Sequence, residues 1–384
     1  MEYPRTLQLP ELLQRKSFFL LGPRTTGKTW LVRRQLGDGA AVIDLLRGDV
    51  FLRLSANPSE LAGMVEAGVG AGKRWVAIDE IQRLPELLNE VHRLIEERGV
   101  RFLMTGSSAR KLRRGGTNLL AGRAWTAELH PLTSREIPGF DLERYLRFGG
   151  LPSVYGAEEP EEELSAYIQT YLTQEIQAEA SVRRLPPFSR FLTGAALANG
   201  RTLNFAALAG DAEVPASTIR EYYGLLEDTL LGFALEPWRR SRTRKAVATA
   251  KFYFFDVGVA HALAGTRALD RNSDLYGRSF EHWLGVEMRA FLSYSRLREP
   301  LGFWRSVHGY EVDFVVGERV AVEAKASRRV GKEDLRGLRA LKEEKVFRRL
   351  LLVSQDPIES VRDGIRCVHW KTFLDELWSG RLTG

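Results

Sequence analysis

An eight-residue run near the N-terminus has the residue types and spacing of a phosphate-binding loop. Residues 22–29 read GPRTTGKT and match the pattern G-x-x-x-x-G-K-[ST]. Glycines let backbone N–H groups turn toward phosphate oxygens, and the helix that follows adds partial positive charge at its N-terminus. We expect Lys28 to reach the β- and γ-phosphates of ATP and Thr29 to hold Mg²⁺. The rest of the nucleotide site is then made by the loop residues Gly22, Pro23, Arg24, Thr25, Thr26 and Gly27.

Two acidic residues after an apolar run complete the expected ATP site. Residues 76–80 read VAIDE, which predicts a buried strand ending at Asp79 and Glu80. Asp79 is expected to help hold Mg²⁺, and Glu80 to act as general base on the attacking water. Ser107 or Ser108, in the TGSS turn, is expected to contact the γ-phosphate. Arg123, in LLAGRA, is expected to stabilise transition-state charge, and if it acts on a neighbour's nucleotide the protein must form an oligomer.

A second constellation lies near the C-terminus. Glu281 falls in a predicted amphipathic helix, RSFEHWLGVEMRAF. Asp313 lies in the alternating run YEVDFVV, and Glu323 and Lys325 lie in VAVEAKAS, which a turn at Gly317 connects to it. Side chains repeat every second residue on one face of a strand, so Glu323 and Lys325 should lie on the same face.

These residue types suit phosphodiester hydrolysis. Asp313 and Glu323 offer hard oxygen ligands for Mg²⁺ or Mn²⁺, which would polarise the phosphate and acidify a bound water. Lys325 is expected to orient that water or stabilise developing charge, and Glu281 to complete the metal's surroundings from the helix. Whether the site cleaves nucleic acid or only binds it is left open by the residues.

The elements that must position these groups indicate an α/β protein. Apolar runs at 17–21, 41–46, 74–80 and 101–108 alternate with helical patterns, which predicts a parallel sheet covered by helices. Helical texture dominates after about residue 135, and strands return near residue 251. We therefore expect a P-loop ATPase domain over 1–135, a helical segment over 136–250, and a further α/β domain over 251–384.

The middle segment carries a helix-turn-helix pattern over 200–232. Ser217, Thr218, Arg220 and Tyr223 fall on the candidate recognition helix, and the basic run WRRSRTRKA at 238–246 follows at the position of a wing. The alternatives are a helical packing module and a solvated charged loop. The histidines show no metal-ligand spacing, so His282 and His308 are expected to be structural or surface groups.

Composition limits the class of protein. The 384 residues carry a net charge of +7, which suits a polyanionic partner such as DNA but also fits a bias toward arginine. One cysteine, Cys367, excludes an intrachain disulfide. No apolar run approaches the roughly 20 residues that span a bilayer, and no export signal is evident, so we expect a cytoplasmic protein without membrane contact.

The order of these motifs resembles a bacterial and archaeal family of AAA-type ATPases. The shared runs are GPRTTGKT, VAIDEIQRLP, FLMTGSSARKL, LLAGRA, PLTSREI, FGGLP and EVDFVV, which extend over nearly the whole chain. The resemblance implies an N-terminal P-loop AAA-type domain, a winged-helix-like middle and a C-terminal PD-(D/E)XK, or restriction-endonuclease-like, domain. It implies architecture more readily than a biological role.

The leading interpretation is an ATP-dependent DNA-processing enzyme, in which ATP hydrolysis drives translocation along DNA or remodelling of branched DNA. It would act as a homo-oligomer, and Arg123 acting between subunits makes a ring plausible. One alternative is a nucleotide-controlled regulatory or defence switch with slow hydrolysis. Another is an ATP-controlled DNA-binding module whose nuclease-like domain is inactive.

Overall fold

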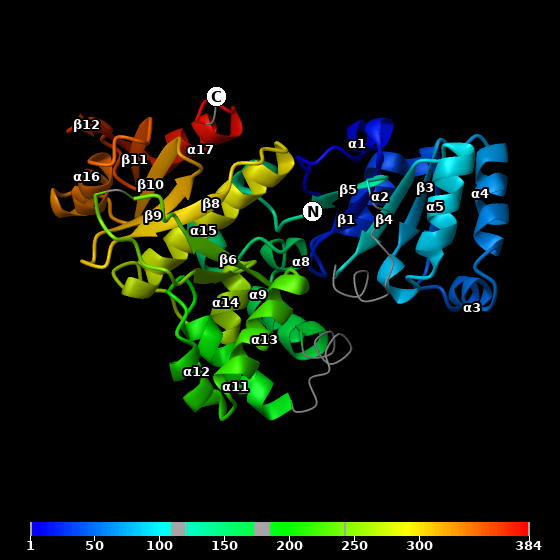
Figure 1. Cartoon of the computed structure of the whole chain (residues 1–384), viewed down its shortest axis with the longest axis horizontal. Coiled ribbons are helices and arrows are strands. Elements are labelled where there is room, and N and C mark those ends of the chain that lie inside the picture. Colours follow the sequence, from blue (N-terminus) through cyan, green and yellow to red (C-terminus); the bar gives the residue numbers. More distant parts are fainter. Residues whose placement is uncertain (1, 109–119, 121, 173–184, 242, 383–384) are drawn as a thin grey trace.

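The computed structural model describes residues 2–108, 120, 122–172, 185–241 and 243–382. Within these residues the strands form two separate sheets, one toward each end of the chain (Figure 1). The N-terminal sheet has the order β2-β3-β4-β1-β5, and every neighbouring pair is parallel. Its strands are β1 (Ser17–Leu21), β2 (Ala40–Asp44), β3 (Trp75–Asp79), β4 (Phe102–Gly106) and β5 (Ala124–Glu128).

Helices cover both faces of this sheet. One face packs on α1 (Leu9–Arg15) and α2 (Lys28–Leu36), and the other on α3 (Gly48–Ala56), α4 (Glu60–Gly70) and α5 (Leu87–Arg98). Alternation in β1 shows why a continuous apolar run is needed. Phe18 and Leu20 join the α1–α2 core, whereas Phe19 and Leu21 join the α3–α5 core. The predicted parallel, helix-covered sheet is confirmed.

The sequence patterns did not predict β5. Its residues AWTAE are half-buried or exposed except Ala127, because β5 is an edge strand beside β1. A strand with one buried side chain shows no apolar run and no regular alternation.

The middle of the chain is helical, as predicted. Its helices are α7 (Leu142–Phe148), α8 (Pro152–Tyr155), α9 (Pro160–Ala166), the π-helix at Tyr167–Leu172, α11 (Leu185–Leu197), α12 (Phe205–Ala212), α13 (Ala216–Asp228) and α14 (Val257–Leu263). The helices α11 to α14 share one apolar core with the aromatic side chains Phe252 and Phe254 of strand β7.

The C-terminal sheet is mixed. Its order is β12-β13-β11-β10-β9-β8-β6-β7, and β9 pairs antiparallel with β10 across the turn at Gly317, as predicted. The strands are β6 (Gly232–Pro237), β7 (Lys251–Phe254), β8 (Leu301–Arg305), β9 (Glu311–Val316), β10 (Val320–Lys325), β11 (Arg349–Ser354), β12 (Ser360–Arg362) and β13 (Ile365–His369). One face packs on α15 (Asp274–Tyr294) and α17 (Trp370–Trp378), the other on α16 (Arg336–Lys342).

Helix α15 joins the two ends of the molecule (Figure 1). Phe280 and Trp283 in its first half pack in the core of the C-terminal sheet. Arg289 in its second half forms an ion pair with Glu128 of β5, at 2.8 Å between Nη2 and Oε2.

No helix in the described part of the chain is long and apolar enough to cross a membrane.

We expect Gly258→Ala to destabilise the protein by about 1–3 kcal/mol, because a Cβ at Gly258 would lie 2.0 Å from the carbonyl oxygen of Phe148, at the end of α7. The matched control is Gly277→Ala, inside α15, where a Cβ meets no described atom within 4 Å. That change should be neutral or stabilise by about 0.5–1 kcal/mol, because alanine is the better helix former. Denaturant unfolding midpoints measure both, and equal midpoints would contradict the packing described for α7 and α14.

Candidate functional site

The loop between β1 and α2 has the shape of an anion cradle. Thr25 and Gly27 adopt left-handed backbone conformations, with φ of 62° and 92°, which turn successive N–H groups to one side. Gly22 is required because a Cβ there would lie 2.5 Å from the carbonyl oxygen of Leu129. The loop ends where α2 begins at Lys28, so the helix N-terminus points into the same space.

Lys28, Thr29 and Asp79 lie together at the carboxyl edge of the sheet. The Lys28 ammonium donates to the carbonyl oxygens of Gly22 (2.7 Å) and Pro23 (3.0 Å). The Thr29 hydroxyl donates to Asp79 Oδ2 at 2.8 Å, which joins the loop to the end of β3. A hydroxyl and a carboxylate in contact are the oxygen donors that Mg²⁺ takes beside nucleotide phosphates, so these residues fit ATP and Mg²⁺.

Two residues that the sequence analysis missed contact the acidic pair. The Thr105 hydroxyl donates to Asp79 Oδ1 and accepts from the backbone N–H of Glu80, 3.1 Å away. The Gln82 amide donates to Glu80 Oε2 and to Ser107 Oγ, the latter at 3.2 Å. Both residues lie inside motifs that the sequence analysis identified, Gln82 in VAIDEIQRLP and Thr105 in TGSS. A polar side chain next to an apolar strand was the signal that could have identified each as a site residue.

Arg123 lies just before β5 and contacts helix α5. Its Nε donates to Glu96 Oε1 at 2.5 Å, and its side chain is 37% exposed. The action of Arg123 on a neighbour's nucleotide stays a prediction.

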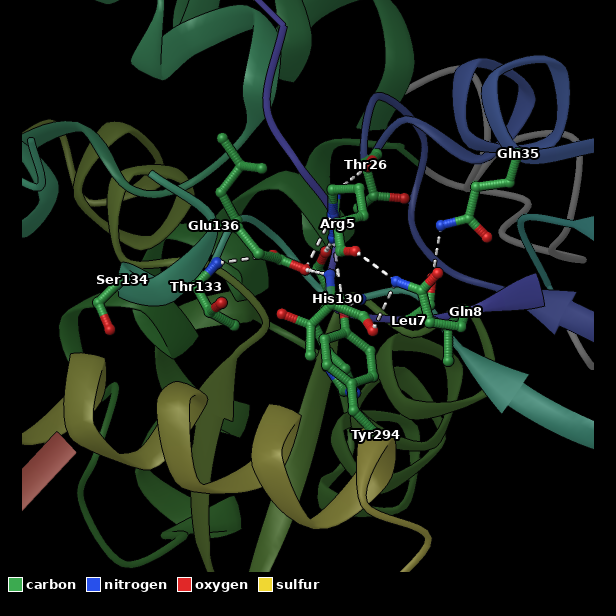
Figure 2. A network of polar contacts seen from close by, with 12 residues as sticks. Arg5, Leu7, Gln8, Thr26, Gln35, His130, Thr133, Ser134, Glu136 and Tyr294 are labelled. Atoms are coloured by element: carbon green, nitrogen blue, oxygen red, sulfur yellow. Dashed lines mark hydrogen bonds and ion pairs between the residues drawn. The ribbon is translucent and has the colours of Figure 1, made fainter. Parts of the chain in front are cut away.

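Arg5 ties the loop to the rest of the molecule (Figure 2). Its guanidinium is buried and donates to the carbonyl oxygens of Thr26 (2.8 Å) and His130 (2.6 Å) and to the Tyr294 hydroxyl (3.2 Å). Its Nε lies 3.2 Å from Glu136 Oε1, and both side chains are almost fully buried. A residue of the nucleotide loop and the last residue of α15 therefore share one cation.

The C-terminal residues singled out from the sequence also converge. Glu281 from α15, Asp313 from β9, and Glu323 and Lys325 from β10 lie in one buried cluster, which we call the acidic cluster. The Lys325 ammonium lies 2.6 Å from Glu323 Oε1, and Asp313 Oδ2 accepts from the Ala324 backbone N–H at 2.8 Å.

Three further residues of the acidic cluster were missed. The Lys251 ammonium, from β7, lies 2.9 Å from Glu281 Oε1, 2.6 Å from Glu311 Oε1 and 3.9 Å from Asp313 Oδ1. The Tyr253 hydroxyl donates to Glu281 Oε1 at 2.5 Å. Nothing in the sequence near Lys251 marks it, because β7 lies some 30 residues before Glu281 and only the sheet order brings the two together.

Burial and mutual repulsion set the protonation of the acidic cluster. Burial, followed by repulsion from Glu281, raises the pKa of Asp313 to about 7. Burial and the neighbouring Asp313 raise the pKa of Glu323 well above its ordinary value. Burial alone would raise the pKa of Glu281, but Lys251 and the Tyr253 hydroxyl outweigh it and lower that pKa. Lys251 is held charged: burial would lower its pKa, and the surrounding carboxylates raise it.

The acidic cluster contains a carboxylate oxygen that a further cation could contact. Glu323 Oε2 is buried and has no hydrogen-bond partner among the described residues. Carboxyls whose pKa values are raised by burial and repulsion gain from any cation that replaces their protons. Within the described residues, however, no group of three or more acidic, histidine or cysteine side chains is arranged to hold a metal ion. Lys251 and Lys325 already neutralise part of the charge, so a divalent cation on Asp313 and Glu323 stays a prediction.

The middle segment keeps only part of its candidate surface. Ser217 and Arg220 on α13 are exposed, whereas Tyr223 is buried against Phe191 and Phe252, so its assignment to a nucleic-acid-contacting face was wrong. In the 238–246 run, Arg239, Arg240 and Arg244 make contacts within the chain, Arg244 with Glu343 at 2.6 Å. Residue 242 lies outside the described residues.

The two histidines of the sequence analysis differ in exposure. His282 is buried: its Nε2 lies 2.6 Å from the Phe254 carbonyl oxygen and its Nδ1 lies 3.1 Å from the Asn199 amide. Burial lowers the pKa of His282 to about 4, so the ring is neutral near pH 7. His308 is exposed. The prediction of structural and surface roles is confirmed.

We expect Lys251→Met to destabilise the C-terminal sheet by about 3–5 kcal/mol, because it leaves buried carboxylates without their cation. Combining it with Glu281→Gln removes one of those charges, so the double variant should lose less than the sum of the single changes, by about 1–3 kcal/mol. Urea unfolding at pH 7.5 of the four proteins measures this coupling. Additive losses would contradict a direct interaction.

Comparison with known proteins divides the chain into three stretches. Residues 14–138 match the model of an AAA domain, residues 139–270 match a domain of unknown function (DUF8612), and residues 276–373 match another (DUF4143). An uncharacterized protein of Haemophilus influenzae is 24% identical over 235 residues, which cover 56% of this chain and 58% of that protein. The chain therefore carries an AAA domain of the P-loop ATPase type, followed by two domains of unknown function.

Proposed function

We propose that this protein is a Mg²⁺-dependent ATPase. The observation that carries the proposal is the 2.8 Å contact between the Thr29 hydroxyl and Asp79, which joins a complete phosphate-binding loop to an acidic strand end. Glu80, next to Asp79, supplies a base at the same edge of the sheet. A chain that only bound nucleotide would need the loop but not this base.

Each residue has one task in this proposal. The loop N–H groups and the Lys28 ammonium bind and neutralise the phosphates, and Thr29 and Asp79 hold Mg²⁺ directly or through water. Lys28, which now contacts the loop carbonyls, turns to the phosphates when they bind. Glu80 accepts the proton of the attacking water, and Ser107 contacts the γ-phosphate.

The test separates binding from hydrolysis. We expect Lys28→Ala to abolish binding of a fluorescent ATP analogue, because the loop loses its positive charge. We expect Glu80→Gln to bind that analogue normally and to lower the ATP turnover number by about 10²- to 10⁴-fold, since only the base is lost. Turnover that survives either change would contradict the assignment of the site.

We further propose that ATP hydrolysis drives work on DNA, with the acidic cluster as a nuclease-like site of the PD-(D/E)XK type. The support is the convergence of Glu281, Asp313, Glu323 and Lys325 from one helix and two adjacent strands, with an unpartnered oxygen on Glu323 among the described residues. Mg²⁺ or Mn²⁺ bound by Asp313 and Glu323 would polarise a phosphodiester and acidify water. Lys325 would stabilise the negative charge that develops.

We also propose that the middle segment is winged-helix-like and contacts DNA. The helices α11, α12 and α13 are followed by the antiparallel pair β6–β7, and Thr202 forms a bridge with Lys251 of β7. The 238–246 run connects β6 to β7, which is the position of a wing, and exposed Ser217 and Arg220 lie on α13, the candidate recognition helix.

The nuclease proposal is tested with Mn²⁺ and duplex, single-stranded and four-way-junction DNA. We expect cleavage of at least one form, and its loss in Asp313→Ala/Glu323→Ala, because the metal loses both carboxylate ligands. Asp79→Asn is the matched control, since it removes a metal-holding carboxylate from the other site only. Cleavage retained by the double variant would sink this assignment and leave the ATPase proposal untouched.

The same DNA panel distinguishes the alternatives. ATP turnover stimulated by one DNA form would support a DNA motor. Turnover that no DNA changes would favour a nucleotide-controlled switch. DNA binding without cleavage would favour a binding module with an inactive nuclease-like domain. An active site shared between subunits would be supported by two results together. Arg123→Ala should lose ATP turnover, and the protein should lose its oligomers on dilution.

A further inference from the structure

Gln82 occupies a position that the assigned roles do not explain. It lies in the short helical turn after β3, is 6% exposed, and reaches both the proposed base and the residue expected to contact the γ-phosphate. One N–H of its amide donates to Glu80 Oε2, and Ser107 Oγ lies 3.2 Å from the same nitrogen. A neutral amide thus links Glu80 to the end of β4.

The chemistry of Glu80 determines which way this amide points. A carboxylate only accepts hydrogen bonds, so the Gln82 nitrogen must face it and the Gln82 carbonyl oxygen must face away. That oxygen is buried and has no hydrogen-bond partner among the described residues. Leaving a buried acceptor unpaired costs about 1–3 kcal/mol, so a glutamine with a purely structural role would be expected to have both ends satisfied.

The unpaired oxygen lies beside Gly106, the last residue of β4, which contacts the first residue of the phosphate-binding loop. A Cβ on Gly106 would lie 2.7 Å from this oxygen and 3.4 Å from Leu21 Cδ2, so the oxygen is close to the end of β4 and to the Leu21 side chain of β1. Gly22, the first residue of the phosphate-binding loop, donates its N–H to the Gly106 carbonyl at 3.2 Å. Ligands of parallel α/β sheets bind at this edge.

We propose that Gln82 is a catalytic residue of ATP hydrolysis, whose carbonyl oxygen accepts one O–H of the attacking water while Glu80 accepts the other. The inference rests on the proposed ATPase activity. The water oxygen bonds to the γ-phosphorus, the bond from that phosphorus to the β–γ bridging oxygen breaks, and ADP and phosphate leave. One water proton passes to Glu80, and Gln82 gains and loses none.

Two acceptors fix a water better than one. With Glu80 alone, the water is free to rotate about its single hydrogen bond, and its lone pair points at phosphorus only part of the time. A second acceptor on a rigid turn removes that freedom before the reaction, which is worth most in a buried site. The Gln82 N–H also keeps the Glu80 carboxylate in place beside the water.

The experiment compares Gln82→Met with Gln35→Met. Gln35, in the same domain, also makes two amide hydrogen bonds, to Leu9 N (2.7 Å) and Leu7 O (2.8 Å), but lies at the far end of α2 from the loop. We expect Gln82→Met to lower the ATP turnover number about 10²-fold while the Kd for ATP changes less than about 3-fold. Gln35→Met should lower the melting temperature and leave turnover per folded protein unchanged.

A second readout and variant protect against a folding artefact. After incubation with ATP and Mg²⁺, nucleotide bound to Gln82→Met should remain ATP, whereas wild type should hold ADP. Gln82→Asn keeps the amide but moves its carbonyl by one carbon, and should show the same block with a smaller loss of stability. Turnover within about 3-fold of wild type in both Gln82 variants, or parallel loss of ATP binding and turnover, would overturn the role of Gln82. Absence of hydrolysis by wild type that still binds ATP would overturn the ATPase proposal as well.

Discussion

The contacts of the buried Arg5 guanidinium hold the N-terminal and C-terminal parts of the molecule together. A charge removed from water must be matched by acceptors held in place, and Arg5 finds them in a loop carbonyl, a linker carbonyl, a carboxylate and a hydroxyl. These acceptors come from three parts of the chain that are distant in sequence: Thr26, residues 130–136 and Tyr294. The phosphate-binding loop, the linker after β5 and the end of α15 are therefore constrained together by one side chain from the N-terminal arm.

Helix α15 carries that constraint across the molecule. Glu281 in its first half belongs to the acidic cluster, and Tyr294 at its end contacts Arg5. Thirteen residues separate them, about 20 Å along a helix axis. Further contacts fix the second half against the N-terminal part: Arg289 pairs with Glu128, and Glu287 accepts from the Ser134 N–H. One helix therefore contacts both the acidic cluster and the buried Arg5.

The local parts of both sites were predictable from sequence, and the long-range parts were not. The geometry of three motifs could be predicted directly, because a loop, a strand end and a strand face are set by neighbours in the chain. These motifs are GPRTTGKT, VAIDE and the alternating run VAVEAK. Arg5 and Lys251 each lie far in sequence from the groups they contact, and an isolated Arg or Lys has no pattern. Thr105 and Gln82 lie in motifs that the sequence analysis identified, but the contacts of Thr105 with Asp79 and of Gln82 with Ser107 depend on how β3 and β4 pair.

The origin of Lys251 bears on how such chains can be recombined in evolution. It lies on β7, within the stretch that matches one domain of unknown function, yet it neutralises carboxylates in the stretch that matches another. Strand β6, from the same stretch as β7, pairs with β8 of the later one, so the sheet itself crosses the boundary. Recombination at that boundary would separate the buried Lys251 ammonium from the carboxylates of Glu281 and Glu311. These two segments should therefore be inherited as a pair.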